Sequence, residues 1–231
     1  ISLAFAAFFG ANVLTPQWLQ SFMGYTATSA GMATAWTGVF AVLVAPIAAM
    51  LSSKVDPRKL VFGGVMWLGM VTLLRTTATT DMGYWDVSQP IMLMGLGLPF
   101  FFIPLTGLAL ASVDEHETAS GAGLMNFLRT LSGAFATSLI TTQWDDQITR
   151  NHAELVGLAD SDLAVQSMLE ISGMAPDAVL QSIDRLINGQ AVMLATNQIM
   201  TVVGLAFILA ALAIWLAPKP KRVVDASVGG H

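Results

Sequence analysis

The chain opens with a long apolar stretch, and its first charged side chain is Lys54. A helix that crosses a bilayer needs about 20 predominantly apolar residues, so this stretch has room for two spans and a turn. Similar apolar runs recur along the rest of the sequence. Together they predict six spans, at roughly Leu3–Phe22, Ser29–Leu51, Leu60–Thr80, Val87–Val113, Ala119–Thr142 and Ala191–Ala217.

These spans predict an all-α, polytopic membrane protein. Backbone polar groups cannot stay unpaired in lipid, so apolar segments of this length are expected to cross it as helices. We expect transmembrane helices one to five within residues 1–142 and a polar segment over residues 143–190. A sixth helix should follow over residues 191–217, and a tail over residues 218–231.

The composition agrees with a membrane protein and excludes several other classes. Hydrophobic residues make up 55% of the chain and charged residues only 11%, whereas soluble domains average about 25% charged residues. The absence of cysteine excludes disulfides and thiolate metal sites. The sequence has no basic stripe that would bind a nucleic acid. It also has no metal-binding histidine spacing and no nucleotide-binding or hydrolase motif, so we predict neither an enzyme nor a bound cofactor.

The positions of Lys and Arg predict which ends of the spans are cytoplasmic. One side carries the basic residues of Lys54–Lys59 and of Lys219–Arg222. Basic residues close to span ends are concentrated on the cytoplasmic side of a membrane. We therefore expect both ends of this sequence in the cytoplasm and the polar segment Gln143–Gln190 outside.

That polar segment is acidic and has apolar residues near helical spacing in two places, within Leu163–Ile171 and within Val179–Ile187. Such spacing is typical of amphipathic helices, and Gly173 and Pro176 separate the two sets. We predict two short helices outside the membrane. Two roles remain open for them: a solvated loop that caps the bundle, or a docking surface for an extracytoplasmic partner.

Arg129 lies near the middle of the fifth predicted span. An arginine at the centre of a membrane helix costs roughly 2.5–3.5 kcal/mol on insertion scales, so it needs a compensating environment. A helical projection places it on a face of small and polar residues that includes Asn126 and Gly133, opposite a face of leucine and phenylalanine. Small and polar faces pack inside membrane bundles, so Arg129 is expected to point inward.

No predicted span contains Asp or Glu, so a carboxylate partner for Arg129 would have to come from outside this sequence. The sequence also opens inside an apolar run without an initiator methionine. For both reasons we expect a piece of a longer protein. The alternative for Arg129 is that it caps backbone carbonyls or is hydrated in a cavity.

Prolines and polar residues interrupt the first and fourth spans. Pro16 removes the hydrogen bond to the carbonyl of Asn12, and Gln17 follows it. The fourth span contains Pro99, Pro104 and Thr106 beside several glycines. Interrupted helices line transport pathways in many carriers. The same features also occur as tolerated kinks or for close packing, so both interpretations remain open.

Several segments together carry a family resemblance. They are Leu19–Ala27, Val55–Leu60, Phe101–Thr106 and Asn126–Gly133. With the long polar segment before the last span, they make the chain resemble the second half of EmrB/QacA-type multidrug exporters, the fourteen-span branch of the major facilitator superfamily. The resemblance covers essentially the whole sequence and implies the C-terminal six-helix bundle of a major facilitator fold.

The resemblance implies a proton-coupled pump of the bacterial inner membrane that exports amphipathic or hydrophobic compounds by alternating access. The pump would be driven by the proton gradient and would need no cofactor. The acidic residues that couple transport to protons would lie in the N-terminal half, which this sequence lacks. Its partners would be that half, the lipid bilayer, a periplasmic adaptor and an outer-membrane channel. The alternative is a non-transporting scaffold or sensor derived from a half-transporter.

Candidate functional residues follow from the intramembrane polar positions and from this resemblance. Segment Ser52–Leu60 is similar to the cytoplasmic loop motif of the superfamily, which implies a gating role for its charged residues. The candidates for gating are Asp56, Arg58, Lys59, Pro16, Pro99 and Pro104. The candidates for substrate binding or coupling are Arg129, Asn126, Asn12, Gln17 and Thr106.

Overall fold

The computed structural model describes residues 2–79, 82–111, 113, 115–158 and 176–216. Within these residues the backbone is helical, with turns and no strand, which confirms the all-α prediction. The long helices are α1 (Ser2–Ser21), α2 (Ala27–Ser52), α3 (Pro57–Leu74), α4 (Tyr84–Ala111), α5 (Thr118–Leu158) and α7 (Pro176–Ala213). Three short 3₁₀ turns accompany them: η1 (Arg75–Thr77), η2 (Glu115–Glu117) and η3 (Ile214–Leu216).

Among the described residues, four helical segments are long and apolar enough to cross a membrane. They are Ala27–Ser52, Pro57–Thr77, Tyr84–Leu110 and Asp177–Leu216. The helices α1 and α5, which we also predicted as spans, do not reach the same hydropathy. The reason is visible in their sequences, since α1 contains Asn12 and Gln17 while the first half of α5 is rich in Gly, Ser and Thr and contains Arg129.

Local sequence explains where the helices begin. The hydroxyl of Thr26 accepts a hydrogen bond from the backbone N–H of Ser29 at 3.1 Å and caps α2. A carboxylate oxygen of Asp56 accepts from the N–H of Arg58 at 3.0 Å, and Pro57 occupies the first helical position of α3. A polar cap followed by proline is a strong helix start. Gly24 has a φ of 69°, which favours glycine, in the turn between α1 and α2.

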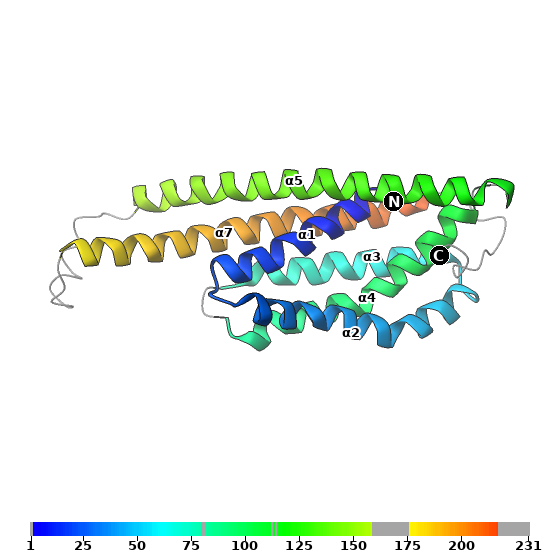
Figure 1. Ribbon diagram of the computed structural model, residues 1–231, viewed down its shortest axis with the longest axis horizontal. Coiled ribbons are helices and arrows are strands. Elements are labelled where there is room, and N and C mark those ends of the chain that lie inside the picture. Colours follow the sequence, from blue (N-terminus) through cyan, green and yellow to red (C-terminus); the bar gives the residue numbers. More distant parts are fainter. Residues whose placement is uncertain (1, 80–81, 112, 114, 159–175, 217–231) are drawn as a thin grey trace.

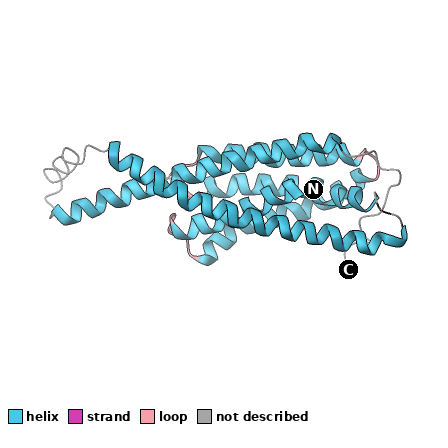
Figure 2. Cartoon of the chain, turned by 90° about the horizontal axis from the view of Figure 1, so that it is seen from above, coloured by secondary structure: helices cyan, strands magenta, loops and turns pink. Residues whose placement is uncertain are grey.

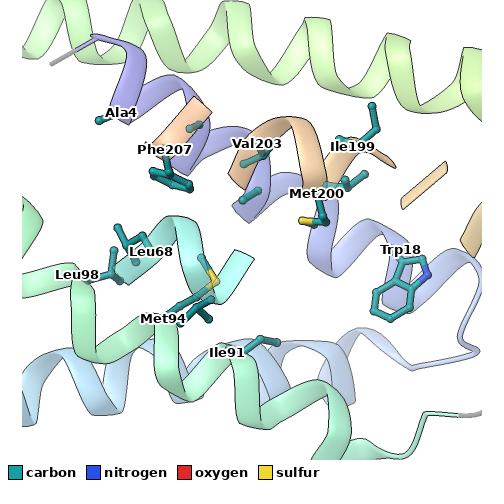
Figure 3. Close-up of a cluster of buried hydrophobic side chains, with 14 of the residues drawn as sticks. Ala4, Trp18, Leu68, Ile91, Met94, Leu98, Ile199, Met200, Val203 and Phe207 are labelled. Carbon is teal, nitrogen blue, oxygen red and sulfur yellow. The ribbon is translucent and has the colours of Figure 1, made fainter. Parts of the chain in front are cut away.

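The helices lie side by side and alternate in direction (Figures 1 and 2). We call the end with the α1–α2 turn the Tyr25 end, and the end with the α2–α3 turn the Lys54 end. α2 and α3 pack against α4, α3 also packs against α7, and α5 packs against α1 and α7. Buried side chains of α1, α3, α4 and α7 meet between these helices (Figure 3).

Glycines allow α4 to approach its neighbours closely. A Cβ atom on Gly95 would lie 2.5 Å from the backbone oxygen of Thr37 in α2, and one on Gly64 would lie 2.8 Å from the backbone carbon of Phe100. Neither neighbour can move without shifting a helix. The glycines in the middle of α4 and α3 therefore serve close packing, one of the two roles left open for this part of the chain.

The two longest helices differ from the prediction. α5 continues to Leu158 instead of ending at Thr142, and α7 begins at Pro176, before the predicted start at Ala191. The apolar residues between Val179 and Ile187 therefore belong to the same helix as the last span and do not form a separate short helix. The other predicted short helix, within Leu163–Ile171, lies outside the described residues.

The extra length forms a helical hairpin that projects beyond the other helices at the Tyr25 end (Figure 1). α5 has 41 residues, which makes it roughly 60 Å long at the rise of an α-helix. The hydrocarbon core of a bilayer is only about 30 Å thick. We call the parts of α5 and α7 on this side, residues 145–158 and 176–190, the projecting hairpin.

Candidate functional site

A polar cavity lies between α1, α2 and α4, about one to three helical turns from the Tyr25 end of these helices. It encloses about 290 Å³. Its wall includes Asn12, Thr15, Thr34 and Thr37, and the side chain of Arg75 from η1 closes it on one side. Exposed residues of α1 and α2 border it, which places its opening along the seam between these two helices.

Arg75 is fixed at this cavity by two neighbours. Its Nη2 donates a hydrogen bond to the hydroxyl oxygen of Thr15 at 2.8 Å, and its Nη1 lies 3.7 Å from the sulfur of Met94. Thr15 and Met94 both line the cavity, so the guanidinium end is located there. Arg75 forms no ion pair among the described residues. Its positive charge is therefore held by neutral groups.

The hydroxyl groups around the cavity donate their protons to backbone carbonyls. Thr15 donates to Ala11 at 2.8 Å, Thr34 donates to Ala30 at 2.9 Å, and Thr37 donates across the helix interface to Ile91 at 3.3 Å. The amide of Asn12 likewise donates to the carbonyl of Phe8 at 2.9 Å. The guanidinium of Arg75 is therefore the strongest donor group with capacity left at this cavity.

A second cavity of about 270 Å³ lies on the other side of Arg75, towards the start of α4 and towards α7. Trp18, Asp86 and Thr196 contribute to its wall. A carboxylate oxygen of Asp86 accepts a hydrogen bond from the backbone N–H of Gly83 at 2.9 Å at the start of α4. Asp86 and Arg75 share this cavity without forming an ion pair.

Arg129 lies on α5 towards α1, as its helical face predicted. Its guanidinium carbon is 5.4 Å from the centre of the Phe5 ring, a cation–π distance. The opposite face of α5 is exposed and apolar, with Phe135 72% exposed. Asn126 is exposed one turn earlier, and its backbone carbonyl accepts from the hydroxyl of Thr130 at 2.9 Å. Arg129 forms no ion pair among the described residues.

Thr106, Pro99 and Pro104 are integrated into the helix packing of α4. Both prolines are buried, and Thr106 donates a hydrogen bond to the carbonyl of Phe102 at 2.8 Å. The Phe102 ring contacts the Phe5 ring beneath Arg129, with 5.5 Å between ring centres. Arg129 thus borders an aromatic cluster that includes Phe102, while none of the three α4 residues lines either cavity.

The candidates of α1 divide between the cavity and the surface. Asn12 and Pro16 both line the first cavity together with Arg75. Gln17 is exposed and lies outside the wall of both cavities. The structure therefore brings together Asn12 and Pro16 at the first cavity. Asn12 also binds the carbonyl of Phe8, whose ring contacts Phe102 in the aromatic cluster that Arg129 contacts.

The charged residues of the predicted gating motif begin α3 at the Lys54 end. Asp56 caps the helix, Lys59 is exposed, and Arg58 is buried with 7% of its surface accessible. The Nε and Nη2 atoms of Arg58 are buried without a hydrogen-bond partner among the described residues. Burying a guanidinium without hydrogen-bond partners costs free energy, so Arg58 is the least favourably placed of these three charged residues.

Aromatic side chains gather at the Tyr25 end, where α2 meets α4. The indole N–H of Trp36 donates to the hydroxyl of Tyr84 at 3.3 Å, and the rings of Tyr25 and Tyr84 stack with centres 6.5 Å apart. Burial raises the pKa of Tyr25, and Tyr84 and Asp86 act in the same direction. Tyr25 therefore stays neutral, as suits an anchor at a membrane interface.

The helices α5 and α7 are held together by polar pairs at the base of the projecting hairpin and within it. The indole N–H of buried Trp144 donates to the hydroxyl of Thr196 at 3.0 Å. The side-chain amide of buried Asn151 donates to the carbonyl of Ala191 at 3.3 Å. Farther out, His152 and Asp184 approach to 3.2 Å. These contacts keep α5 and α7 paired beyond the bundle.

Sequence reasoning missed Arg75 as a candidate. It lies within the third predicted span, Leu60–Thr80, but was not among the candidate residues. The signal that identified Arg129 was also present here, because Arg75 is a single charge that follows a long apolar run. Its partner Thr15 is 60 positions away in the sequence, so the contact itself could not be read from the pattern.

Comparison with known proteins assigns the chain to a family. Residues 1–137, more than half of the chain, match the family described as the Major Facilitator Superfamily. The chain belongs to that superfamily. The helical bundle and its candidate membrane spans agree with a multi-pass membrane protein of this fold.

Its similarity within the superfamily is to EmrB-type proteins, as the sequence motifs indicated. The chain is 32% identical over 236 aligned positions to the multidrug export protein EmrB of Escherichia coli (strain K12), covering all of the chain and 46% of that protein. It is 30% identical to the probable multidrug resistance protein EmrY of the same strain, covering 95% of the chain and 44% of that protein.

A third relative is the fatty acid resistance protein FarB of Neisseria gonorrhoeae, 30% identical over all of the chain and 46% of that protein. The chain therefore spans about half the length of the curated relatives it matches. The names of these relatives therefore support a proposal for the function of this chain.

Proposed function

We propose that this chain is the C-terminal half of a proton-coupled exporter of amphipathic or hydrophobic compounds in the bacterial inner membrane. The observation that carries the proposal is its similarity, along its whole length, to proteins named for multidrug export. The relative named for fatty acid resistance supports an amphipathic substrate. Transport would follow alternating access, in which this bundle and an N-terminal bundle rock about a site between them.

In this proposal Arg129 and Arg75, the two arginines within predicted spans, have different roles. Asn126 is exposed on α5, and Arg129 contacts the Phe5 ring without an ion pair among the described residues. We assign Arg129 to pairing with an acid of the N-terminal half or with an anionic group of the substrate. Asn12, Gln17 and Thr106 are assigned as weaker substrate contacts at separate places, on the Arg75 cavity, on the surface of α1 and within α4.

The gating role is assigned to the start of α3. The buried, unpaired nitrogens of Arg58 support it, because a carboxylate that approached them in another conformation would be held strongly. Asp56 and Lys59 flank Arg58 at this end. Pro16, Pro99 and Pro104 would allow α1 and α4 to bend during the change.

The orientation follows from the same proposal. The Lys54 end would lie in the cytoplasm, with both ends of this sequence, and the projecting hairpin would lie in the periplasm. There it would contact a periplasmic adaptor that leads to an outer-membrane channel. The supporting observation is that the hairpin extends past the other helices at the opposite end from Lys54, Arg58 and Lys59.

Efflux of a fluorescent dye tests the proposal. Cells that express this chain joined to its N-terminal half should export the dye when the proton gradient is intact, whereas cells that express the chain alone should not. Efflux from the chain alone would contradict the assignment as a half. If the joined form reaches the membrane and exports nothing, the scaffold or sensor alternative gains instead.

Substitution of Arg129 tests its assigned role. Arg129→Ala in the complete transporter should reduce efflux to the level of cells without it, because the intramembrane positive charge is lost. Leu128→Ala, on the exposed neighbouring position of the same helix, should keep efflux. Membrane levels of both variants should equal those of the parent. Full efflux from Arg129→Ala would remove Arg129 from the mechanism.

A further inference from the structure

We propose that the cavity closed by Arg75 is a binding site for the negatively charged head group of an amphipathic monoanion, with a carboxylate as the best fit. This inference rests on the proposed export function, since it names a substrate class and the residue that selects it. The site is separate from Arg129, which lies on another helix against Phe5.

The first argument is the uncompensated charge. Arginine stays protonated in proteins, so Arg75 carries its full charge in the described structure. Its contacts are a hydroxyl oxygen of Thr15 and the sulfur of Met94, which are both neutral. Asp86 borders the neighbouring cavity without forming an ion pair with Arg75. A ligand that supplies one negative charge would therefore find no competing carboxylate at this guanidinium among the described residues.

The second argument is the pattern of donors. The threonine hydroxyls and the Asn12 amide at this cavity already donate to backbone carbonyls. The guanidinium is the charged donor group at this cavity, beside the second N–H of the Asn12 amide, so an anion binds best at Arg75. A single guanidinium matches a single negative charge, and its planar fork matches the two oxygens of a carboxylate. A dianion such as a phosphate monoester would bury a second charge without a partner.

The third argument is the shape of the site. A cavity of about 290 Å³ lies at the lower limit of ligand pockets, which are roughly 300–1,000 Å³. It can hold a head group and the first carbons of a chain, while the rest of the ligand has to leave through the opening between α1 and α2. Ile91 and Met94 provide apolar surface beside the charge, and they lie on the same helix facing the core (Figure 3). This combination suits an amphiphile.

Binding of a fluorescent amphiphile tests the proposal. The complete transporter is purified and placed in nanodiscs of zwitterionic lipid, so that no anionic head group competes. The probes are dansyl-labelled undecanoate and its amide, which has the same tail without the charge. A charge-assisted hydrogen-bonded pair should make the carboxylate bind about tenfold more tightly than the amide, or better.

Four variants locate that preference. Arg75→Gln should abolish the difference between carboxylate and amide, whereas Arg75→Lys should retain most of it because the charge remains. Thr15→Val removes the hydroxyl contact without changing the charge, so it should keep the preference. Arg150→Gln, at an exposed position of α5 that has no assigned role, is the matched control and should also keep it. If Arg75→Gln does not fold, the carboxylate preference of Arg75→Lys is compared with that of the parent. Lysine offers a point charge in place of the planar fork of arginine.

The outcomes separate this inference from the proposed function. Equal binding of carboxylate and amide by the parent, or an unchanged preference in Arg75→Gln, would overturn the inference even if dye efflux is normal. Loss of the preference in Arg150→Gln as well as in Arg75→Gln would show a general effect of removing a positive charge and would overturn the inference. Conversely, a preference that depends on Arg75 in a protein without efflux would support the site and contradict the export function.

Discussion

At the scale of single residues, the two arginines within the helical bundle differ in what balances their charge. Arg129 faces an aromatic ring, while Arg75 donates to a hydroxyl oxygen beside a cavity. Aromatic faces attract cations by about 0.5–2 kcal/mol, which recovers part of the cost of placing arginine in a membrane. A neutral hydroxyl offers a hydrogen bond but no counter-charge. Of the two arginines, Arg75 is therefore the one that an added anion would stabilise more.

Single residues also set how closely the helices approach. Gly95→Ala in the complete transporter should lower the midpoint of thermal unfolding in detergent, because its Cβ would lie 2.5 Å from a backbone oxygen of α2. Forced overpacking of this kind costs about 1–3 kcal/mol. The matched control is Gly63→Ala in α3, where no atom lies within 4 Å of an added Cβ. An unchanged midpoint for Gly95→Ala would show that α2 and α4 separate easily.

The expected effect of the control has the opposite sign. Alanine favours a helix over glycine by roughly 0.5–1 kcal/mol, so Gly63→Ala should leave the midpoint equal or raise it. A decrease for both variants would point to a general intolerance of alanine at these glycines and not to the contact with Thr37. The comparison of the two midpoints thus isolates the close approach itself.

At the scale of helices, Asp56 has two possible contributions that one pair of variants separates. Its carboxylate caps α3, and loss of such a cap costs about 0.5–2 kcal/mol. Asp56→Ala should therefore destabilise the transporter, whereas Asp56→Asn keeps a capping oxygen and should match the parent in thermal unfolding. If gating needs the negative charge, Asp56→Asn should nevertheless lose dye efflux. Normal efflux from Asp56→Asn would leave Asp56 with the cap alone.

The helices themselves were largely predictable from the sequence. The predicted starts and ends of the first four spans lie close to those of α1–α4, because each apolar run stops at a polar turn, and side-chain caps start α2 and α3. The prediction failed where a helix continues beyond its apolar segment. Beyond Thr142, α5 continues as a polar helix whose inner face is Trp144, Ile148, Asn151 and Leu155, at helical spacing. That stripe was a readable signal, but a search for apolar runs does not detect it.

At the scale of the whole molecule, the grouping of the candidate residues could not be predicted. Asn12 and Pro16 share a cavity with Arg75, whereas Arg129 borders the aromatic cluster at Phe5. These groupings depend on which helices become neighbours, and single-span patterns carry little information on that. The facing of α5 was predictable because it needs only the helical period. The cavity was not, because it needs α1, α2, η1 and α4 together.

The projecting hairpin gives the whole molecule a surface beyond the bundle. It carries exposed apolar side chains, with Leu158 81% and Leu186 60% exposed, among acidic residues. Exposure of large apolar side chains to water is unfavourable, and clusters of them on a surface often mark interaction sites. Under the proposed orientation the hairpin lies in the periplasm, so we expect a periplasmic adaptor to cover these side chains.

Site-specific photo-crosslinking tests this contact in cells. A crosslinker at exposed Gln181 of the hairpin should capture the adaptor when both are expressed, and the product should disappear when the adaptor gene is deleted. The matched control is Met32 on α2, which is also exposed but belongs to the bundle, where lipid or the N-terminal half would cover it. Capture from Met32 alone, or from both positions equally, would place the adaptor elsewhere. Leu186→Asp should weaken the product from Gln181, because a buried carboxylate in the interface would lack a partner.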